Sequence, residues 1–167
     1  MQTLEQLREQ DRTAAAAPGP TGLGGWLILP MVGMVVNPII GTIGLQDYFP
    51  LLAQGANLDA TQTVVIWFEV ISNVAIQLIA PFVLLTLFFQ KRRTFPSLFV
   101  GWVLTNLVFV LVDLVFVYNA FRAYYDSPGA VFWDEATAQS VSRAVIYAAI
   151  WIPYMLNSKR VRNTFVN

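Results

Sequence analysis

The sequence contains no cysteine and no histidine, and only 12% of its 167 residues are charged. Without those two residue types the chain has no disulfide, no thiol nucleophile, no imidazole acid or base, and none of the usual ligands of zinc, copper or haem. A metal site would need carboxylates alone, which suit Mg²⁺ or Ca²⁺. The acids do not follow a metal-binding spacing, so we expect no metal and no cofactor. The formal net charge is zero, and nothing in the composition indicates a nucleic-acid partner.

Charged residues are scarce because long apolar stretches fill most of the chain. These stretches cover roughly residues 23–45, 64–89, 98–118 and 140–156. Three of them exceed the ~20 residues that a helix needs to cross a hydrocarbon core of about 30 Å, and the fourth falls just short. Soluble domains carry about 25% charged residues, twice the fraction found here. We therefore predict an all-α integral membrane protein with a four-helix bundle.

The apolar stretches divide the chain into three parts. Residues 1–21 are polar, then alanine-rich, then rich in proline and glycine. They lack the positive start and short apolar core of a secretory signal, so we expect the first apolar stretch to remain as an anchor. The prediction is a disordered cytoplasmic tail over 1–21, a four-transmembrane-helix domain over 22–157, and a basic cytoplasmic tail over 158–167.

Basic residues gather on alternate connectors. The segments 46–63 and 119–139 contain a single basic residue, Arg122. Short loops rich in Lys and Arg stay in the cytoplasm, so both termini and the middle connector are predicted to be cytoplasmic. Anionic lipid headgroups are expected to attract the basic residues that follow the second and fourth stretches, namely Lys91, Arg92, Arg93, Lys159, Arg160 and Arg162.

The two outer connectors combine aromatic rings with acids. Amphipathic rings prefer the headgroup level of a bilayer, so these side chains are predicted to anchor the protein at the interface. The alternative is that they cover a binding site. They are Tyr48, Phe49, Tyr124, Tyr125, Phe132 and Trp133.

Polar residues inside the apolar stretches are the candidates for a site. They recur at intervals of four or seven, which places each set on one face of its helix: Glu69, Asn73 and Gln77; Asn106 and Asp113; Arg143 and Tyr147. Asn37 lies between Gly33 and Gly41 at intervals of four, on a stripe where a second backbone can approach closely. Each helix thus has one side that is costly to expose to lipid, and packing those sides together predicts a polar interior.

The depth of these residues predicts one charged layer. Counted from the ends of the apolar stretches, Glu69 and Asp113 lie about 7 Å below the outer boundary, and Arg143 lies near the start of the fourth stretch. An unpaired charge in the bilayer costs about 2.5–3.5 kcal/mol, so we expect Arg143 to pair with one acid or to bridge both. The candidate buried site is Glu69, Asn73, Asp113, Arg143 and Tyr147, with Asn37, Gln77 and Asn106 as a second group.

Two interpretations of this layer remain open. A buried ion pair can fix the register of the helices, which is a structural role. Alternatively, the layer binds a proton, an ion or a ligand, because charges inside a membrane are often functional. Two acids and one base sum to −1, which leaves one acid to be protonated or to bind a cation.

Several segments resemble one known family. They are GGWLILPMVG (24–33), FEVISN (68–73), the basic connector 91–93, and WIPYMLNSKRVRNTF (151–165). Together they resemble the bacterial membrane proteins catalogued as domain of unknown function 2569, over nearly the whole chain beyond residue 21. The resemblance implies a multi-pass, four-helix protein of the bacterial inner membrane, and it assigns no catalytic residue.

Three functions are compatible with these features. The leading hypothesis is a non-enzymatic accessory or interaction protein, or one that responds to a small molecule, with the buried polar layer in the outer leaflet as its centre. The alternative is a small proton- or ion-coupled transporter. An enzyme is disfavoured, because without His or Cys the acid–base chemistry falls to one carboxyl group. The lipid bilayer is the expected partner, and a second copy of the chain or another membrane protein remains open.

Overall fold

A computed structural model describes residues 21–53 and 58–167, and this part of the chain is helical without a β-strand. The tail predicted over 1–21 therefore lies outside the described residues, except for Thr21. In chain order the elements are η1 (Gly25–Leu27), α2 (Ile28–Leu45), α3 (Tyr48–Ala53), α4 (Ala60–Asn73), the π-helix η3 (Val74–Ile79), α5 (Ala80–Phe89), α6 (Phe95–Ala120), α7 (Arg122–Tyr125), α8 (Glu135–Asn157) and α9 (Lys159–Thr164).

Within the described residues, three continuous helical segments are long and apolar enough to cross a membrane. They are Gly25–Ala53, Ala60–Phe89 and Phe95–Ala120. The fourth predicted stretch forms α8, a helix of 23 residues whose first turns carry Thr137, Gln139, Ser140 and Arg143. These polar residues make α8 less apolar than the other three segments, in line with the short fourth stretch in the sequence.

Two of the helices begin earlier than the apolar stretches predict. Helix α4 begins at Ala60 and α8 at Glu135, whereas the apolar stretches begin at 64 and 140. An aspartate N-cap explains each difference, because its carboxylate accepts a hydrogen bond from a free backbone N–H of the first turn. Asp59 accepts from Gln62 and Asp134 from Thr137, both at 2.8 Å. The bonds from Thr137 also hold the pKa of Asp134 below its usual range.

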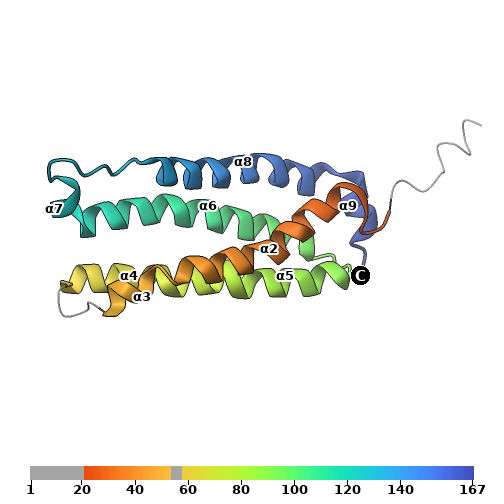
Figure 1. The fold of residues 1–167 in the computed structure, drawn as a ribbon. Helices are drawn as coiled ribbons and strands as arrows, with labels where there is room; N and C mark the ends of the chain where they lie inside the picture. Colours follow the sequence, from red (N-terminus) through yellow and green to blue (C-terminus); the bar gives the residue numbers. More distant parts are fainter. Residues whose placement is uncertain (1–20, 54–57) are drawn as a thin grey trace, which may run out of the picture.

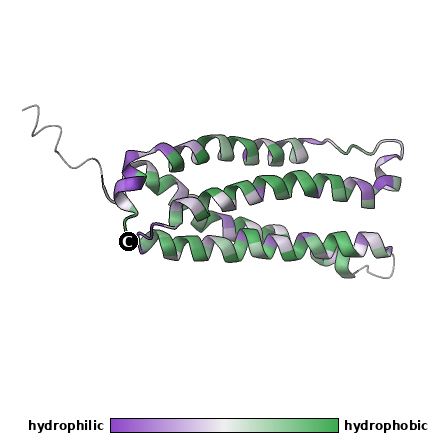
Figure 2. Cartoon of the chain, turned by 180° about the vertical axis from the view of Figure 1, so that it is seen from behind, coloured by the Kyte–Doolittle hydropathy of each residue, from purple (hydrophilic) through white to green (hydrophobic). Residues whose placement is uncertain are grey.

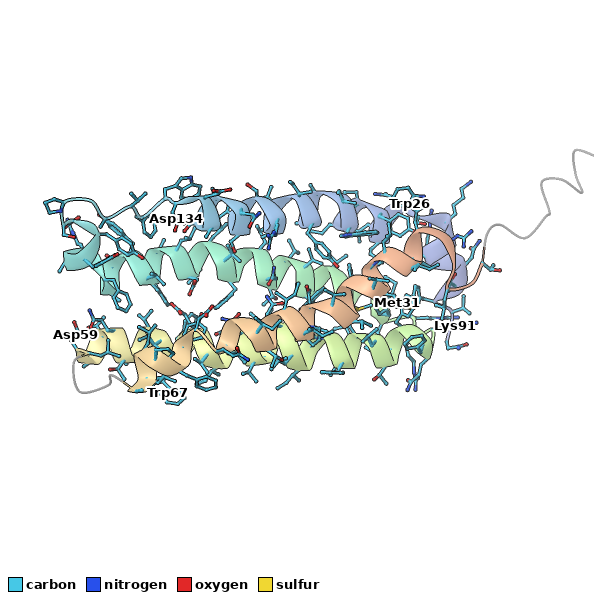
Figure 3. The ribbon with its side chains drawn as sticks, viewed as in Figure 1. Trp26, Met31, Asp59, Trp67, Lys91 and Asp134 are labelled. Atoms are coloured by element: carbon cyan, nitrogen blue, oxygen red, sulfur yellow. The ribbon has the colours of Figure 1, made fainter. Side chains whose placement is uncertain are left out.

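The long helices lie side by side along one axis (Figure 1). Helix α8 packs along α6, while α2 packs against η3 and α5, and α4 packs against α6. One end of the molecule carries Lys91, α9 and the C-terminus, and we call it the basic end. The other carries Asp59 and Asp134, as Figure 3 shows, and we call it the acidic end. Between the two ends the helices are mostly apolar (Figure 2), as a bilayer requires.

The core is concentrated at the basic end, where four phenylalanine rings meet. The rings of Phe95 and Phe165 stack with their centroids 4.6 Å apart, and Phe88 meets Phe95 at 5.2 Å. Phe99 continues the cluster along α6, 5.7 Å from Phe95. All four side chains are 4% exposed or less. We call Phe88, Phe95, Phe99 and Phe165 the aromatic plug, because they fill the space between the helices at this end.

The segment 158–167, predicted to be a basic cytoplasmic tail, contains a short helix. It forms α9 and folds back onto the bundle, where Val161 and Phe165 are buried. The Arg160 guanidinium donates to the Gly24 carbonyl at 2.9 Å, and the Arg93 backbone N–H donates to the Asn167 carbonyl at 2.7 Å. The apolar residues among the basic ones explain why this segment folds back, because they pack against the aromatic plug while the charged groups remain at the surface.

The π-helix η3 lies in the middle of the segment Ala60–Phe89 and has a local cause. In a π-helix the carbonyl of Ile76 would accept from the residue five positions later, which is Pro81, and proline has no N–H. The indole N–H of Trp102 in α6 supplies this bond instead, with Nε1 2.8 Å from the Ile76 oxygen. A neighbouring helix therefore supplies the hydrogen bond that this irregular turn lacks. Backbone polar groups inside a membrane must be paired within the protein.

The predicted small-residue stripe on α2 is confirmed as a place of close helix contact. A Cβ atom added to Gly41 would lie 2.8 Å from Cβ of Gln77 in η3, and one added to Gly33 would lie 3.2 Å from the Tyr147 hydroxyl. The contact at Gly41 is shorter than van der Waals distance and involves an atom fixed to the backbone. Glycine at this position thus sets the distance between α2 and η3.

Gly41→Ala is expected to destabilise the protein by about 1–3 kcal/mol, because the added methyl group forces α2 away from η3. Thermal unfolding in detergent measures this effect. Gly44→Ala is the matched control, since it lies in the same helix and a Cβ there has no neighbour within 4 Å. Equal melting temperatures of the two variants would contradict the close approach at Gly41.

Candidate functional site: a polar cavity between the helices

The middle of the bundle is not completely filled by side chains. A cavity of about 680 Å³ lies between α2, η3, α6 and α8. Its volume falls within the range of about 300–1,000 Å³ that is typical of small-molecule sites. The polar side chains around it are Asn37, Asp47, Tyr48, Asn73, Gln77, Asn106, Ser140, Arg143 and Tyr147, and the apolar ones include Ile40, Val110, Trp102, Ile146, Ile150 and Trp151.

One pair of amides spans this cavity. The Nε2 group of Gln77 in η3 donates to Oδ1 of Asn106 in α6, at 2.7 Å. Sequence reasoning placed both residues in a second group of candidates, and the structure brings them into direct contact. Such hydrogen bonds between helices hold polar side chains together inside a membrane.

Arg143 lies at the level of this amide pair. The Trp102 and Tyr147 rings meet with centroids 6.3 Å apart, so these positions of the antiparallel helices α6 and α8 are neighbours. Asn106 and Arg143 each lie four residues, about one turn, further toward the acidic end. Gly41 of α2 contacts Gln77 at the same level. The cavity therefore contains a layer formed by Gly41, Gln77, Asn106 and Arg143.

The predicted pairing of Arg143 with Glu69 and Asp113 is wrong. Within residues 21–53 and 58–167 the one ion pair joins Arg122 to Asp126, at 3.2 Å. The N-cap of α8 is the physical reason, because it starts the helix at Glu135 and places Arg143 eight residues into it. Along α6, Asp113 is seven residues from Asn106, which separates it from the level of Arg143 by about 10 Å.

Glu69 and Asp113 form a separate site, as neighbours on α4 and α6. They line a second cavity of about 390 Å³ together with Tyr124 and Tyr125 of the connector after α6. Glu69 is only 7% exposed, and Oδ1 of Asp113 is buried without a hydrogen-bond partner in the described structure. The hydroxyl group of Tyr48 faces Glu69 from α3.

The remaining candidates have simpler surroundings. Asn73 lines the larger cavity and donates to the Glu69 carbonyl of its own helix at 3.0 Å, and Asn37 lines the same cavity from α2. The Tyr147 ring packs against Trp151 at 6.1 Å, while its buried hydroxyl has no partner in the described part of the chain. The candidates therefore divide between two cavities and do not form the single layer that was predicted.

Two kinds of site residue escaped the sequence analysis. Tyr48 is predicted to be an interfacial anchor, with a cover over a binding site as the alternative, and in the structure it faces Glu69. Trp102 and Trp151 line the larger cavity, although nothing in an apolar stretch marks a tryptophan as a site residue. The sequence contains an indication of such a role only for Trp102. Pro81 leaves a backbone carbonyl without a donor, and a buried indole N–H needs an acceptor.

The arrangement is suited to binding. Amides, hydroxyl groups and one guanidinium surround the larger cavity, together with aromatic and aliphatic side chains. The described residues contain no group of three or more acids that could hold a metal ion.

These features define a class: an all-helical integral membrane protein with a polar cavity inside its membrane region. The chain belongs to the family described as protein of unknown function (DUF2569), which matches residues 20–166. The resemblance found in the sequence is thereby confirmed.

A curated relative places this class in a particular membrane. The chain is similar to the inner membrane protein YdgK of Escherichia coli (strain K12), with 25% identity over 154 residues that cover 89% of this chain and 96% of that protein. Together with the three apolar helical segments, this similarity confirms the predicted location in the inner membrane. No solved structure matches the chain.

Proposed function

We propose that this chain is a non-enzymatic binding protein of the inner membrane, which holds an amphipathic molecule in the larger cavity. The observation that carries the proposal is the cavity of about 680 Å³, with polar groups in a layer and apolar side chains around them. A molecule with a polar head and an apolar chain matches both kinds of lining. An accessory role, in which the bound molecule alters contacts with another membrane protein, is compatible with a sequence that contains no histidine and no cysteine.

The packing of the helices supports entry of the ligand from the bilayer. Helices α2 and α8 both line the cavity, yet each packs mainly on another helix, α2 on α5 and α8 on α6. Figure 1 shows α2 close to α8 at the basic end and far from it at the acidic end. The aromatic plug fills the basic end, so the cavity is closed there.

Filling the cavity tests this function. Gly44 lines it, and a Cβ there meets no atom within 4 Å, so Gly44→Trp places an indole in the space. Gly101→Trp is the matched control, because Gly101 also lies in a helix with open space around it but does not line the cavity. Mass spectrometry of lipid extracts should find the bound amphipath with the parent and with Gly101→Trp, and strongly reduced with Gly44→Trp. Equal amounts in all three proteins would rule out the proposal.

One observation favours a second candidate, a small transporter. The π-helix η3 borders the cavity, and π-turns inside helices are frequent at functional sites. Movement at this irregular turn would have to open the aromatic plug for a molecule to pass through. Flux of a labelled amphipath across proteoliposomes separates the two functions, because a binding protein retains its ligand without net transfer.

The proposal includes four membrane crossings with both termini in the cytoplasm. Helix α8 has 23 residues, about 35 Å at 1.5 Å per residue, and it packs along α6. The basic residues Lys91–Arg93 and Arg160 lie at one end of the bundle, which the positive-inside rule assigns to the cytoplasm.

Reporter fusions test this topology. Fusions after Arg93 and Asn167 are expected to report the cytoplasm, and a fusion after Gly129, in the connector between α7 and α8, is expected to report the periplasm. Two sets of fusions are made, one with alkaline phosphatase and one with green fluorescent protein. The two reporters give opposite readings at each site, so their comparison controls for the level of expression. A cytoplasmic reading at Gly129 would show that the segment before α8 does not lie outside.

A further inference from the structure

We infer that the ligand of the larger cavity carries an anionic headgroup, a carboxylate or a phosphate ester with one negative charge. In this inference Arg143 binds the anion beside the amides of Gln77 and Asn106, and the apolar chain of the ligand lies between α2 and α8. The inference rests on the proposed function and specifies the chemical class of its ligand.

Arg143 carries a positive charge within α8. This residue is exposed where the larger cavity opens between the helices, and among the described residues it is in no ion pair and no hydrogen bond with another side chain. Charged side chains inside membranes face a polar interior and pair with an opposite charge, since an uncompensated charge is costly there. Glu69 and Asp113 line the other cavity, and Asp47, which lines the same cavity as Arg143, forms no ion pair with it in the described structure. A bound anion supplies the missing negative charge.

Several hydrogen-bond donors are available at the level of Arg143. The amide pair uses one N–H of Gln77 and the oxygen of Asn106. The Asn106 amide keeps its two N–H groups, and Arg143 adds the five N–H groups of its guanidinium. Such a set of donors suits a carboxylate or a phosphate, which accept several bonds through their oxygens.

The residues around the cavity favour one route to Arg143. Asp47 lines the same cavity six residues beyond Gly41, about 9 Å nearer the acidic end, so it repels anions that come from the aqueous phase on that side. The sides of the cavity instead carry Ile40, Ile146 and Ile150, which are 56%, 58% and 51% exposed. An anion attached to an apolar chain enters past these residues from the lipid, whereas a free anion does not.

The test uses pairs of probes with identical chains and different charge. Delipidated full-length protein is titrated with oleate and oleyl alcohol, and with dioleoyl phosphatidylglycerol and dioleoyl phosphatidylcholine. Native mass spectrometry in detergent gives the affinities. The anionic member of each pair is expected to bind at least about tenfold more tightly, because hydrogen bonds to a charged group are stronger than those between neutral groups.

Variants assign this preference to Arg143. Arg143→Gln should remove the tenfold preference and leave binding of oleyl alcohol unchanged, while Arg143→Lys should retain part of the preference. Arg122→Gln is the control, since Arg122 is also a helical arginine but lies outside the cavity, with its side chain 67% exposed. Arg143→Gln is expected to fold, because it breaks no ion pair in the described structure. Circular dichroism on the same samples checks folding, and Arg143→Lys tests the charge if Arg143→Gln does not fold.

The outcomes separate this inference from the proposed function. Charged and neutral probes could bind equally well, and Gly44→Trp could abolish the binding of both. This result would overturn the inference of an anionic headgroup and would leave the proposal of an amphipathic ligand intact. If no probe binds, both fail. Competition by glycerol phosphate alone, at concentrations similar to those of phosphatidylglycerol, would show that the site takes a free anion, which would overturn the role of the apolar chain. Lack of such competition supports entry from the lipid.

Discussion

Phe95→Ala is expected to destabilise the protein by about 3–5 kcal/mol, as other large-to-small substitutions in a packed core do. The Phe95 side chain is 0% exposed, and its ring contacts Phe88, Phe99 and Phe165. Its loss leaves a cavity at the point where α5, α6 and the segment after α9 meet. Unfolding by sodium dodecyl sulphate in mixed micelles measures the loss of stability.

The matched control is Phe82→Ala in α5. This phenylalanine also lies in an apolar helix but is 61% exposed, so its substitution should change the free energy of unfolding little. A comparable loss in both variants would show that the plug is no better packed than the surface. Phe165→Ala should also destabilise the protein strongly, since Phe165 fastens the C-terminal segment to the bundle.

Trp102→Ala is expected to have a similarly large effect, about 3–5 kcal/mol. Trp102 is 8% exposed and packs against Phe99 and Tyr147. It also donates to the Ile76 carbonyl, which Pro81 leaves without a backbone donor. Trp102→Phe separates the two contributions, because it keeps most of the packing and loses the hydrogen bond. We expect it to cost about 1–3 kcal/mol, the penalty of an unsatisfied buried carbonyl.

Trp67 provides the control for both substitutions at Trp102. It lies in the same continuous helix as Ile76 but is 50% exposed, so Trp67→Ala and Trp67→Phe should change stability little. Hydrogen exchange of the amides in η3 gives a second reading, because loss of the Trp102 bond should increase exchange in this segment. Unchanged exchange in Trp102→Phe would show that the indole N–H does not stabilise the π-helix.

The prediction of the fold succeeded where hydrophobicity alone decides structure. The stretch at 98–118 lies within α6, and the stretch at 23–45 becomes η1 and α2, because long apolar runs in lipid must satisfy their backbone groups within a helix. The stripe of Gly33 and Gly41 was also recognisable, since glycine at intervals of four is a local pattern. In both cases the residues that cause the structure are close together in the sequence.

The candidate site could be predicted only in part. The sequence identified which residues of each helix are polar, and most of them line one of the two cavities. The sequence pattern assigned Arg143 to the wrong neighbours, because the depth of Arg143 in the membrane was counted from the start of the apolar stretch at residue 140. Helix α8 begins five residues earlier, after the Asp134 N-cap. A shift of five residues moves a side chain by about 7.5 Å along a helix, which is enough to change its partners.

The class of the protein, its helical segments and its family could be predicted before the structure was known, because they depend on composition, local periodicity and similarity. The tertiary structure decided that α9 and Phe165 close the basic end, that Gln77 meets Asn106, and that the acids lie apart from Arg143. Each of these facts joins residues far apart in the chain. Their contacts depend on the rotation and relative height of whole helices, which no local pattern specifies.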